Sequence, residues 1–153
     1  AHNRGTLEKH KVDGKIKELI VHRKGATGSY YPGREEIPEL YRPDGSPVII
    51  GGSMETGSYL LVGGPHAGET FCSTAHGSGR TMSRTKAKHM VNGRELVRKM
   101  EERGIYVKSV SYPGVAEEAG FAYKDIDAVV EATKLAGISM PVVKLVPLGN
   151  VKG

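Results

Sequence analysis

The sequence has a single cysteine, Cys72, and no tryptophan. One cysteine cannot form a disulfide within the chain, which excludes a disulfide-stabilised scaffold and favours a reducing, cytoplasmic setting. No apolar run approaches the roughly 20 residues that a membrane-spanning helix needs. We therefore expect a chain that folds around an ordinary hydrophobic core and has no membrane partner.

The remaining composition is that of a globular protein with a basic surface. The chain has 153 residues, of which 38% are hydrophobic and 25% are charged, enough for one domain with a core. The formal net charge of +5 favours a polyanionic partner. The 21 glycines are roughly twice the usual share, which indicates loops whose backbone approaches a ligand closely. The chain does not begin with Met, and we interpret it as a piece of a longer protein.

The first half of the chain predicts strands joined by long loops. Asp13-Gly14 is a tight-turn signal between two alternating segments, which predicts a hairpin over residues 9–23. Short apolar runs predict two further strands, and turn-forming residues predict loops between them. The expected strands are 48–50 and 58–62, and the expected loops are 22–27, 28–47, 51–57 and 63–80.

The second half predicts helices. Asn92 is a suitable N-cap and Gly104 a suitable terminator for a helix over 93–103, whose buried side would carry Leu96, Val97 and Met100. A helix that starts at Asp125 and ends before Gly137 would bury Ile126, Val129, Val130 and Leu135. Further elements are expected as helical segments at 82–89 and 114–119 and strands at 105–110 and 142–148. The expected fold is α+β, with mixed sheets and with helices mainly in the second half.

The most distinctive segment is residues 73–80, which read Ser-Thr-Ala-His-Gly-Ser-Gly-Arg. Glycines after His76 free the backbone and remove side chains that would block a ligand. A neutral imidazole nitrogen is a competent nucleophile toward phosphorus, and Arg80 and Arg84 could bind phosphate. Taken alone, the segment still favours a glycine-rich turn with a surface histidine over a phosphate-binding loop.

Four other segments carry candidate chemistry. Residues 51–59 read Gly-Gly-Ser-Met-Glu-Thr-Gly-Ser-Tyr between two strands, where ligand loops are often found. Residues 22–27 read His-Arg-Lys-Gly-Ala-Thr and suit phosphate binding. Residues 1–3 read Ala-His-Asn, although a lone histidine makes no metal site because a transition metal needs three or four ligands. Lys152, near the end of the sequence, would be read in isolation as an exposed terminal charge.

Together these segments resemble one family. His-Arg-Lys-Gly-Ala-Thr, Gly-Ser-Met-x-Thr-x-Ser-Tyr, Ser-Thr-x-His-Gly-x-Gly-Arg-x-x-Ser-Arg, Arg-Gly-Ile-Tyr-Val, Ala-Tyr-Lys-Asp and Pro-Leu-Gly-x-Val-Lys-Gly occur in that order. The chain resembles the C-terminal third of RtcB RNA ligases over nearly its whole length. The resemblance implies an RtcB-like fold, of which residues 1–153 would form the C-terminal part of a single catalytic domain.

The resemblance implies a GTP- and manganese-dependent RNA ligase that acts in tRNA splicing and RNA repair. Such an enzyme joins an RNA 3′-phosphate or 2′,3′-cyclic phosphate end to a 5′-hydroxyl end through a guanylylated histidine. The nucleophile falls on His76 and a metal-binding histidine on His2. The positions that match nucleotide-binding residues of the family are Asn3, Ser53, Ser58, Gly79, Arg80, Tyr123 and Lys152.

The resemblance also implies partners and a missing part. GTP is the cosubstrate, RNA is the substrate, two manganese ions serve the complete enzyme, and archease is a candidate activating partner. The family's other metal ligands, an Asp, a Cys and two His, belong to N-terminal sequence that this chain lacks. We therefore expect the isolated chain to be inactive in ligation.

Two alternatives stay open at this stage. One is a truncated, non-catalytic RNA- or nucleotide-binding module, and the other is a nucleotide hydrolase with His76 as general base. The sequence also departs from the family pattern at four positions. Glu55 and Cys72 stand where glycine is expected, Gly28 stands where a basic residue is common, and Val146 stands where arginine is expected.

Overall fold

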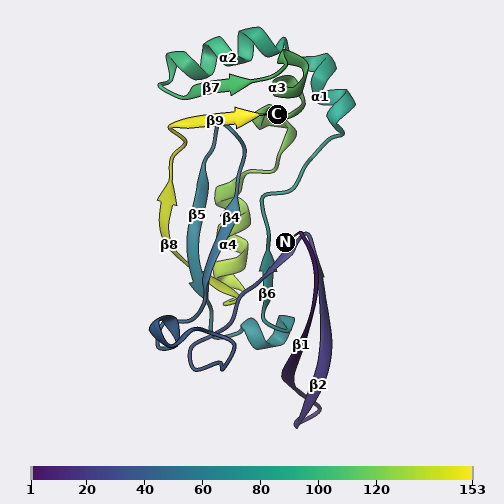
Figure 1. The fold of residues 1–153 in the computed structure, drawn as a ribbon, viewed down its shortest axis with the longest axis vertical. Helices are drawn as coiled ribbons and strands as arrows, with labels where there is room; N and C mark the ends of the chain where they lie inside the picture. The colour runs from purple at the N-terminus through teal and green to yellow at the C-terminus, as the bar shows by residue number, and fades with distance from the viewer. Residues whose placement is uncertain (1, 153) are drawn as a thin grey trace.

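The computed structural model describes residues 2–152, so Ala1 of the Ala-His-Asn motif and Gly153 lie outside the described residues. The fold is mixed α+β, as the sequence predicts. Figure 1 shows three parts along the long axis: a two-stranded hairpin, a central sheet with one helix, and a helical layer. The elements are β1 (Asn3–Val12), β2 (Lys15–Lys24), β3 (Ala26–Gly28), η1 (Glu39–Tyr41), β4 (Pro47–Gly51), β5 (Ser58–Gly63), η2 (Ala67–Thr70), β6 (Ser73–Ala75), α1 (Arg84–Met90), α2 (Gly93–Glu102), β7 (Tyr106–Ser109), α3 (Tyr112–Glu117), η3 (Gly120–Ala122), α4 (Ile126–Leu135), β8 (Ser139–Leu145) and β9 (Gly149–Lys152).

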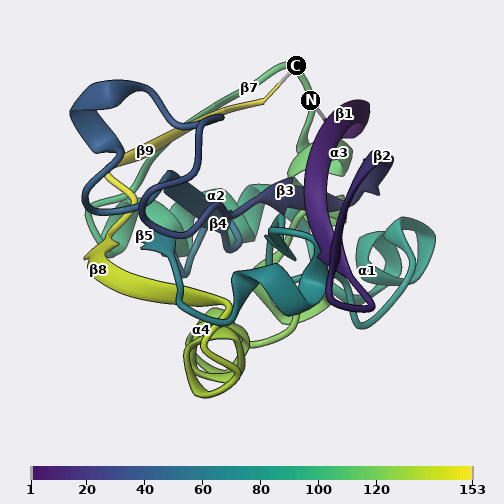
Figure 2. The same cartoon turned by 90° about the horizontal axis from the view of Figure 1, so that it is seen from below.

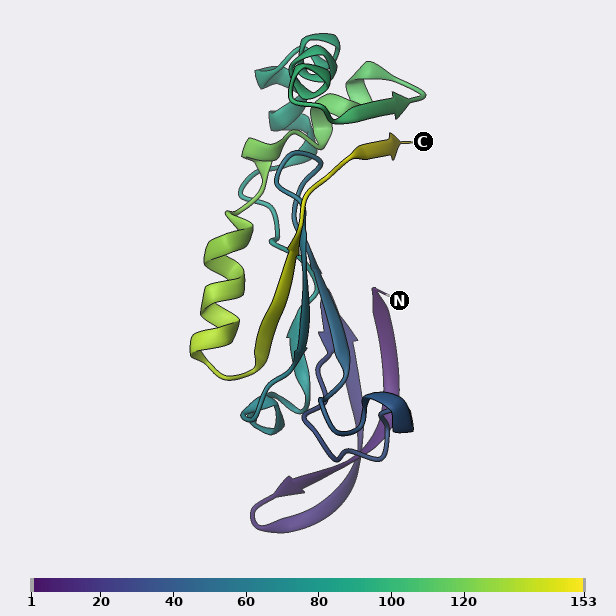
Figure 3. The same cartoon turned by 90° about the vertical axis from the view of Figure 1, so that its left-hand side faces the viewer.

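The central sheet has the order β4-β5-β8, and both of its strand pairs are antiparallel. Helix α4 covers one face of this sheet (Figure 2 and Figure 3). The contact between them is an apolar cluster, and burying each large aliphatic side chain contributes about 1.5–3 kcal/mol. The cluster consists of Val48, Ile50, Leu61, Ile126 and Val130.

The helical layer contains α1, α2, α3 and the parallel pair β7–β9 (Figure 1). Helix α2 begins where the Asn92 side chain accepts hydrogen bonds from the N–H groups of Arg94 and Glu95, which confirms the predicted N-cap. A second apolar cluster lies under this helix. It consists of Met54, Leu96, Met100, Ile105, Val107, Val115 and Ala119.

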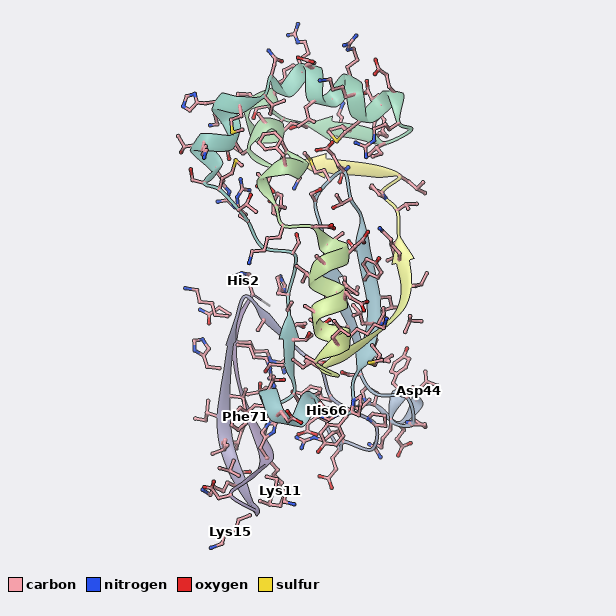
Figure 4. All side chains as sticks on the ribbon, turned by 180° about the vertical axis from the view of Figure 1, so that it is seen from behind. His2, Lys11, Lys15, Asp44, His66 and Phe71 are labelled. Atoms are coloured by element: carbon pink, nitrogen blue, oxygen red, sulfur yellow. The ribbon has the colours of Figure 1, made fainter. Side chains whose placement is uncertain are left out.

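The β1–β2 hairpin turns at Asp13 and Gly14, both with positive φ, as the Asp-Gly signal predicts. Figure 4 shows Lys11 and Lys15 at the free end of the hairpin and His2 at the opposite end. The inner face of the hairpin buries Glu8, which is 3% exposed, and Arg23, which is 7% exposed. A buried ion pair of this kind is destabilising unless hydrogen bonds satisfy both charges.

Those hydrogen bonds are present. Arg23 donates from Nη1 and Nη2 to the two carboxylate oxygens of Glu8, at 2.6 and 2.9 Å. Tyr30 Oη also donates to Glu8, at 2.8 Å. Arg23 further donates to the backbone oxygen of Phe71 at 2.7 Å and to Ser73 Oγ at 2.9 Å. The pair therefore fastens the hairpin to the segment that leads into β6.

The structure corrects several sequence predictions. Residues 22–24, expected in a loop, continue strand β2, and residues 26–28 form β3, which pairs with β6. The last predicted strand begins earlier, at Ser139, and β9 follows it. Leu135, predicted to be buried, is 79% exposed, because the helical period of about 3.6 residues places it about 180° around α4 from the buried Ile126. No helix within residues 2–152 has the length and apolar character to cross a membrane.

The Glu8 network predicts a loss of stability in acid. Burial raises the pKa of Glu8, but the hydrogen bonds from Arg23, His10 and Tyr30 outweigh burial and lower this pKa from 4.5 to about 2. A carboxyl with a depressed folded-state pKa stabilises the fold above pH 4.5, and this contribution disappears as pH falls toward 2. It amounts to roughly 3 kcal/mol, because a tenfold change in proton affinity is worth about 1.4 kcal/mol. Urea denaturation at pH 7, 4 and 2.5 measures the loss.

The matched variant is Glu8→Gln. It leaves Arg23 buried without a counter-charge, so we expect a lower free energy of unfolding than the parent at pH 7. The difference between the two proteins should shrink as pH falls, because the parent loses the same charge. An acid-induced loss of equal size in both proteins would contradict a role for Glu8.

The packing of α4 predicts different effects on stability when two of its side chains are shortened to alanine. Ile126, 1% exposed, lies in the apolar cluster, whereas Leu135 is 79% exposed. We expect Ile126→Ala to lower the free energy of unfolding by about 2–5 kcal/mol and Leu135→Ala to change it by less than about 0.5 kcal/mol. Urea denaturation of both variants checks the pair, and equal losses would contradict the described packing.

Candidate functional site

A pocket of about 400 Å³ lies where segments from five parts of the chain meet. More than half of its lining residues are glycines, so the backbone itself forms much of the wall and is open to a ligand. One histidine comes from residue 2 and the other from the loop after β6. The lining residues are His2, Gly25, Gly51, Gly52, His76, Gly77, Ser78, Gly79 and Tyr123.

A backbone contact between the end of β4 and the loop after β6 holds the pocket wall. The N–H of Ser78 donates to the oxygen of Gly51 at 2.8 Å, and the N–H of Gly51 donates to the oxygen of His76 at 3.4 Å. A Cβ on Gly77 would lie 3.0 Å from the oxygen of Gly51. Glycine at position 77 therefore permits the close approach that fixes the backbone of His76.

The imidazoles of His2 and His76 face each other edge to face, with their ring centroids 5.3 Å apart. His76 is exposed at the pocket rim. Gly25 donates its N–H to the oxygen of His2 at 3.0 Å, and its backbone passes beside the His2 ring. The imidazole of His76 is therefore accessible to a ligand that enters the pocket along its glycine-lined wall.

Tyr123 and Arg80 form the next part of the site. They pair through an isolated antiparallel bridge. Arg80 Nη1 donates to Tyr123 Oη at 3.0 Å, and the guanidinium carbon lies 4.8 Å from the centre of the tyrosine ring. Arg80 also donates from Nη2 to the oxygen of Glu117 and from Nε to the oxygen of Met82. The donors of Arg80 are thus engaged in holding Tyr123 and the neighbouring backbone.

Lys152 lies beside Glu118, with Nζ 3.8 Å from Oε2. The same carboxylate oxygen accepts a hydrogen bond from the phenol of Tyr123. The structure therefore connects two of the predicted site residues, Tyr123 and Lys152, through a third residue that the sequence did not indicate. An acidic residue at the end of a short helix gives no signal of its own, because such residues usually face solvent.

Five predicted site residues are not among those that line this pocket: Arg80 and Lys152, described above, and Asn3, Ser53 and Ser58. Asn3 Oδ1 lies 2.6 Å from His22 Nε2, and Ser58 begins β5 opposite Leu145. Ser53 follows the pocket residue Gly52, and its hydroxyl lies 3.0 Å from that of Thr56.

Glu55 does not line the pocket either. Its carboxylate accepts hydrogen bonds from the N–H of Gly120 at 2.6 Å and from Arg103 at 3.0 Å. The residue therefore ties the loop after β4 to the helical layer.

Cys72 has φ of +50°, the left-handed region that glycine adopts most readily. It is buried, and burial raises the pKa of its thiol. A buried, protonated thiol is a poor nucleophile. Cys72 therefore acts as a small packing residue at a position whose backbone conformation suits glycine.

The residues that the structure describes do not complete a metal centre. Within residues 2–152, no group of three or more His, Cys, Asp or Glu side chains is arranged to hold a metal ion. His2 thus finds no co-ligands among them, and a manganese ion does not fit this set of side chains alone.

The relatives of this chain are RNA-processing enzymes. The tRNA-splicing ligases RtcB of Nanoarchaeum equitans, Archaeoglobus fulgidus and Pyrococcus horikoshii are 51%, 52% and 49% identical to it over 154 residues. Each match covers 100% of this chain. The family model described as tRNA-splicing ligase RtcB matches residues 1–153. The chain belongs to the RtcB family, which confirms the resemblance seen in its motifs.

The chain spans only part of these relatives. It covers 32% of the Nanoarchaeum equitans and Archaeoglobus fulgidus proteins and 18% of the Pyrococcus horikoshii protein. Side chains that complete the site in the longer relatives can therefore come from sequence outside this chain.

The backbone contact at the pocket predicts different effects for two glycine substitutions. A Cβ on Gly77 would press on the oxygen of Gly51, whereas a Cβ on Gly51 would meet nothing within 4 Å. We expect Gly77→Ala to lower the free energy of unfolding by about 1–3 kcal/mol, as overpacking does, and Gly51→Ala to leave it within about 0.5 kcal/mol. Thermal and urea denaturation measure both, and a larger loss in Gly51→Ala would contradict the described contact.

Proposed function

We propose that this chain carries the nucleotide-accepting part of a GTP-dependent RNA ligase, with His76 as the residue that becomes guanylylated. The observation that carries the proposal is the exposed imidazole of His76 on a glycine-lined wall, beside His2 and opposite the Tyr123–Arg80 pair. Membership of the RtcB family supports the same chemistry. The substrates are RNA ends, one with a 3′-phosphate or 2′,3′-cyclic phosphate and one with a 5′-hydroxyl.

The proposed reaction has three balanced nucleotidyl and phosphoryl transfers. A neutral nitrogen of His76 attacks the α-phosphorus of GTP, forming a P–N bond and releasing pyrophosphate. A 2′,3′-cyclic phosphate end first adds water, which breaks the P–O2′ bond and gives the 3′-phosphate. An oxygen of the RNA 3′-phosphate then attacks the phosphorus bound to His76, so the P–N bond breaks and His76 is restored. The 5′-hydroxyl finally attacks the activated RNA phosphorus, and GMP leaves. Covalent catalysis divides one difficult substitution into easier steps.

The chain's own groups support these transfers in distinct ways. Glycines at 77 and 79 leave the wall beside His76 free of side chains. Tyr123 and Lys152 are proposed to hold the guanine, and Ser53 and Ser58 to contact the guanylate. The net charge of +5 and the lysines of the β1–β2 hairpin (Figure 4) would attract the RNA backbone.

The complete enzyme is proposed to need more than this chain. His2 would be one ligand of two manganese ions, with the other ligands from sequence outside the chain, and the metal would supply neutralisation of the triphosphate charge. Archease is proposed as an activating partner. The single unpaired cysteine fits a reducing compartment, the cytoplasm.

A chimera tests the proposal. The segment of the Nanoarchaeum equitans relative that matches this chain, 32% of that protein, is replaced by the 153 residues. We expect incubation with radiolabelled GTP and manganese to label the chimera covalently and to ligate RNA ends, whereas the isolated 153-residue chain takes no label. A histidine adduct is lost in acid and survives alkali.

The controls are His76→Ala and His66→Ala. His66 pairs with Glu69 at the surface, outside the pocket, so its loss should leave labelling unchanged. His76→Ala should remove labelling completely. Label that persists in His76→Ala would reject the proposal. A chimera that binds RNA but takes no label would favour the alternative, a non-catalytic RNA-binding module, which the basic charge of the chain supports.

A further inference from the structure

Glu118 lies where several charged and polar side chains meet, and the proposed reaction gives this residue no role. It follows α3, and its side chain is 22% exposed. Its carboxylate meets four side chains from four different segments of the fold. They are Arg80 after β6, Arg84 at the start of α1, Tyr123 after η3 and Lys152 at the end of β9.

The two carboxylate oxygens have different partners. Oε2 accepts the hydrogen bond from the phenol of Tyr123 and lies 3.8 Å from Lys152 Nζ. Oε1 lies 3.5 Å from Arg80 Nη1 and 3.6 Å from Arg84 Nε. Glu118 is therefore the common counter-charge for three cations, one of which, Arg80, also contacts Tyr123.

The phenol of Tyr123 is fixed from both sides. Its oxygen accepts a hydrogen bond from Arg80 at 3.0 Å and donates one to Glu118. With its donor and its acceptor role both satisfied, the ring is held in one orientation at the pocket. Burial and the hydrogen bond to Glu118 raise the pKa of Tyr123, which keeps the phenol protonated and able to donate.

The carboxylate keeps its charge at neutral pH. Burial raises the pKa of Glu118, but the hydrogen bond from Tyr123 and the charges of Lys152, Arg80 and Arg84 outweigh it and lower this pKa below its usual value. Strand β9, which carries Lys152, is held to the rest of the fold by its parallel pairing with β7 and by Asn150, which donates to the oxygen of Met54. Glu118 adds the contact that directs the Lys152 side chain toward Tyr123.

We infer that Glu118 is a positioning residue that sets the Tyr123 ring and the Lys152 ammonium as a unit for recognition of the guanine base. The inference rests on the proposed function, because it assigns the base-binding end of that same pocket. Glu118 does not touch the reacting phosphorus. Its loss should therefore weaken nucleotide binding and base discrimination more than it slows the transfer to His76.

The test uses the chimera with Glu118→Gln and, as matched control, Glu117→Gln. The neighbouring carboxylate of Glu117 pairs with Lys88 at 2.6 Å and takes no part in the cluster. For Glu118→Gln we expect the GTP concentration that gives half-maximal labelling to rise about tenfold, which corresponds to about 1.4 kcal/mol of binding free energy. The maximal labelling rate should stay within about threefold, and the preference for GTP over ATP should fall.

A second readout follows Lys152 directly in the same proteins. Acetic anhydride modifies free lysine amines, and mass spectrometry measures the rate at each lysine. We expect Glu118→Gln to accelerate modification of Lys152 by a few-fold and leave Lys88 unchanged, whereas Glu117→Gln does the reverse. This pattern separates the local role of Glu118 from a general loosening of the fold.

The outcomes are distinguishable. An unlabelled parent chimera rejects the proposed function and the base-recognition role with it. A labelled parent in which Glu118→Gln behaves as Glu117→Gln overturns the role of Glu118 alone. A fall in the labelling rate at unchanged half-maximal GTP concentration, or an unchanged reactivity of Lys152, also overturns it.

Discussion

The close backbone contact between Gly51 and the loop 76–78 is the constraint on which the candidate site depends. It joins the end of β4, in the central sheet, to the loop after β6 through the hydrogen bond from Ser78 to Gly51. A Cβ at position 77 would lie 3.0 Å from the oxygen of Gly51 and would press on it. With this contact in place, the sheet that packs on α4 also determines where the His76 imidazole stands. The core and the pocket are thus parts of one rigid arrangement.

The sequence predicted elements whose signals are local. The Asp13-Gly14 turn and the Asn92 cap are confirmed because each depends on a few adjacent residues. Strands β3, β6 and β9 were missed because each is three or four residues long and is stabilised by pairing with a distant segment. Leu135 was misplaced because the prediction did not follow the helical period, which puts this residue about 180° around α4 from the buried Ile126.

The candidate site could be foreseen only in part. Motif order indicated His76, His2 and Tyr123, and these three line one pocket. The roles of Glu118 and Glu55 could not be foreseen, because a lone carboxylate in sequence does not reveal the cations or N–H groups that tertiary structure brings to it. The burial pattern of the β1–β2 hairpin could not be predicted from the sequence either. Its buried inner face is the polar Glu8–Arg23 pair, while Leu7 and Ile20 are on its exposed face.

The parallel pairing of β9 with β7 has a consequence for biosynthesis. Strand β9 is the last element in chain order. Four elements separate β7 from β9 in the sequence, so β7 is synthesised well before the strand with which it pairs. During translation, the wall around His76 can assemble while residues 149–152 are still inside the ribosome. Lys152 reaches Glu118 only after these residues emerge. A nascent chain therefore passes through a stage in which the pocket around His76 can form but the contact between Lys152 and Glu118 is absent.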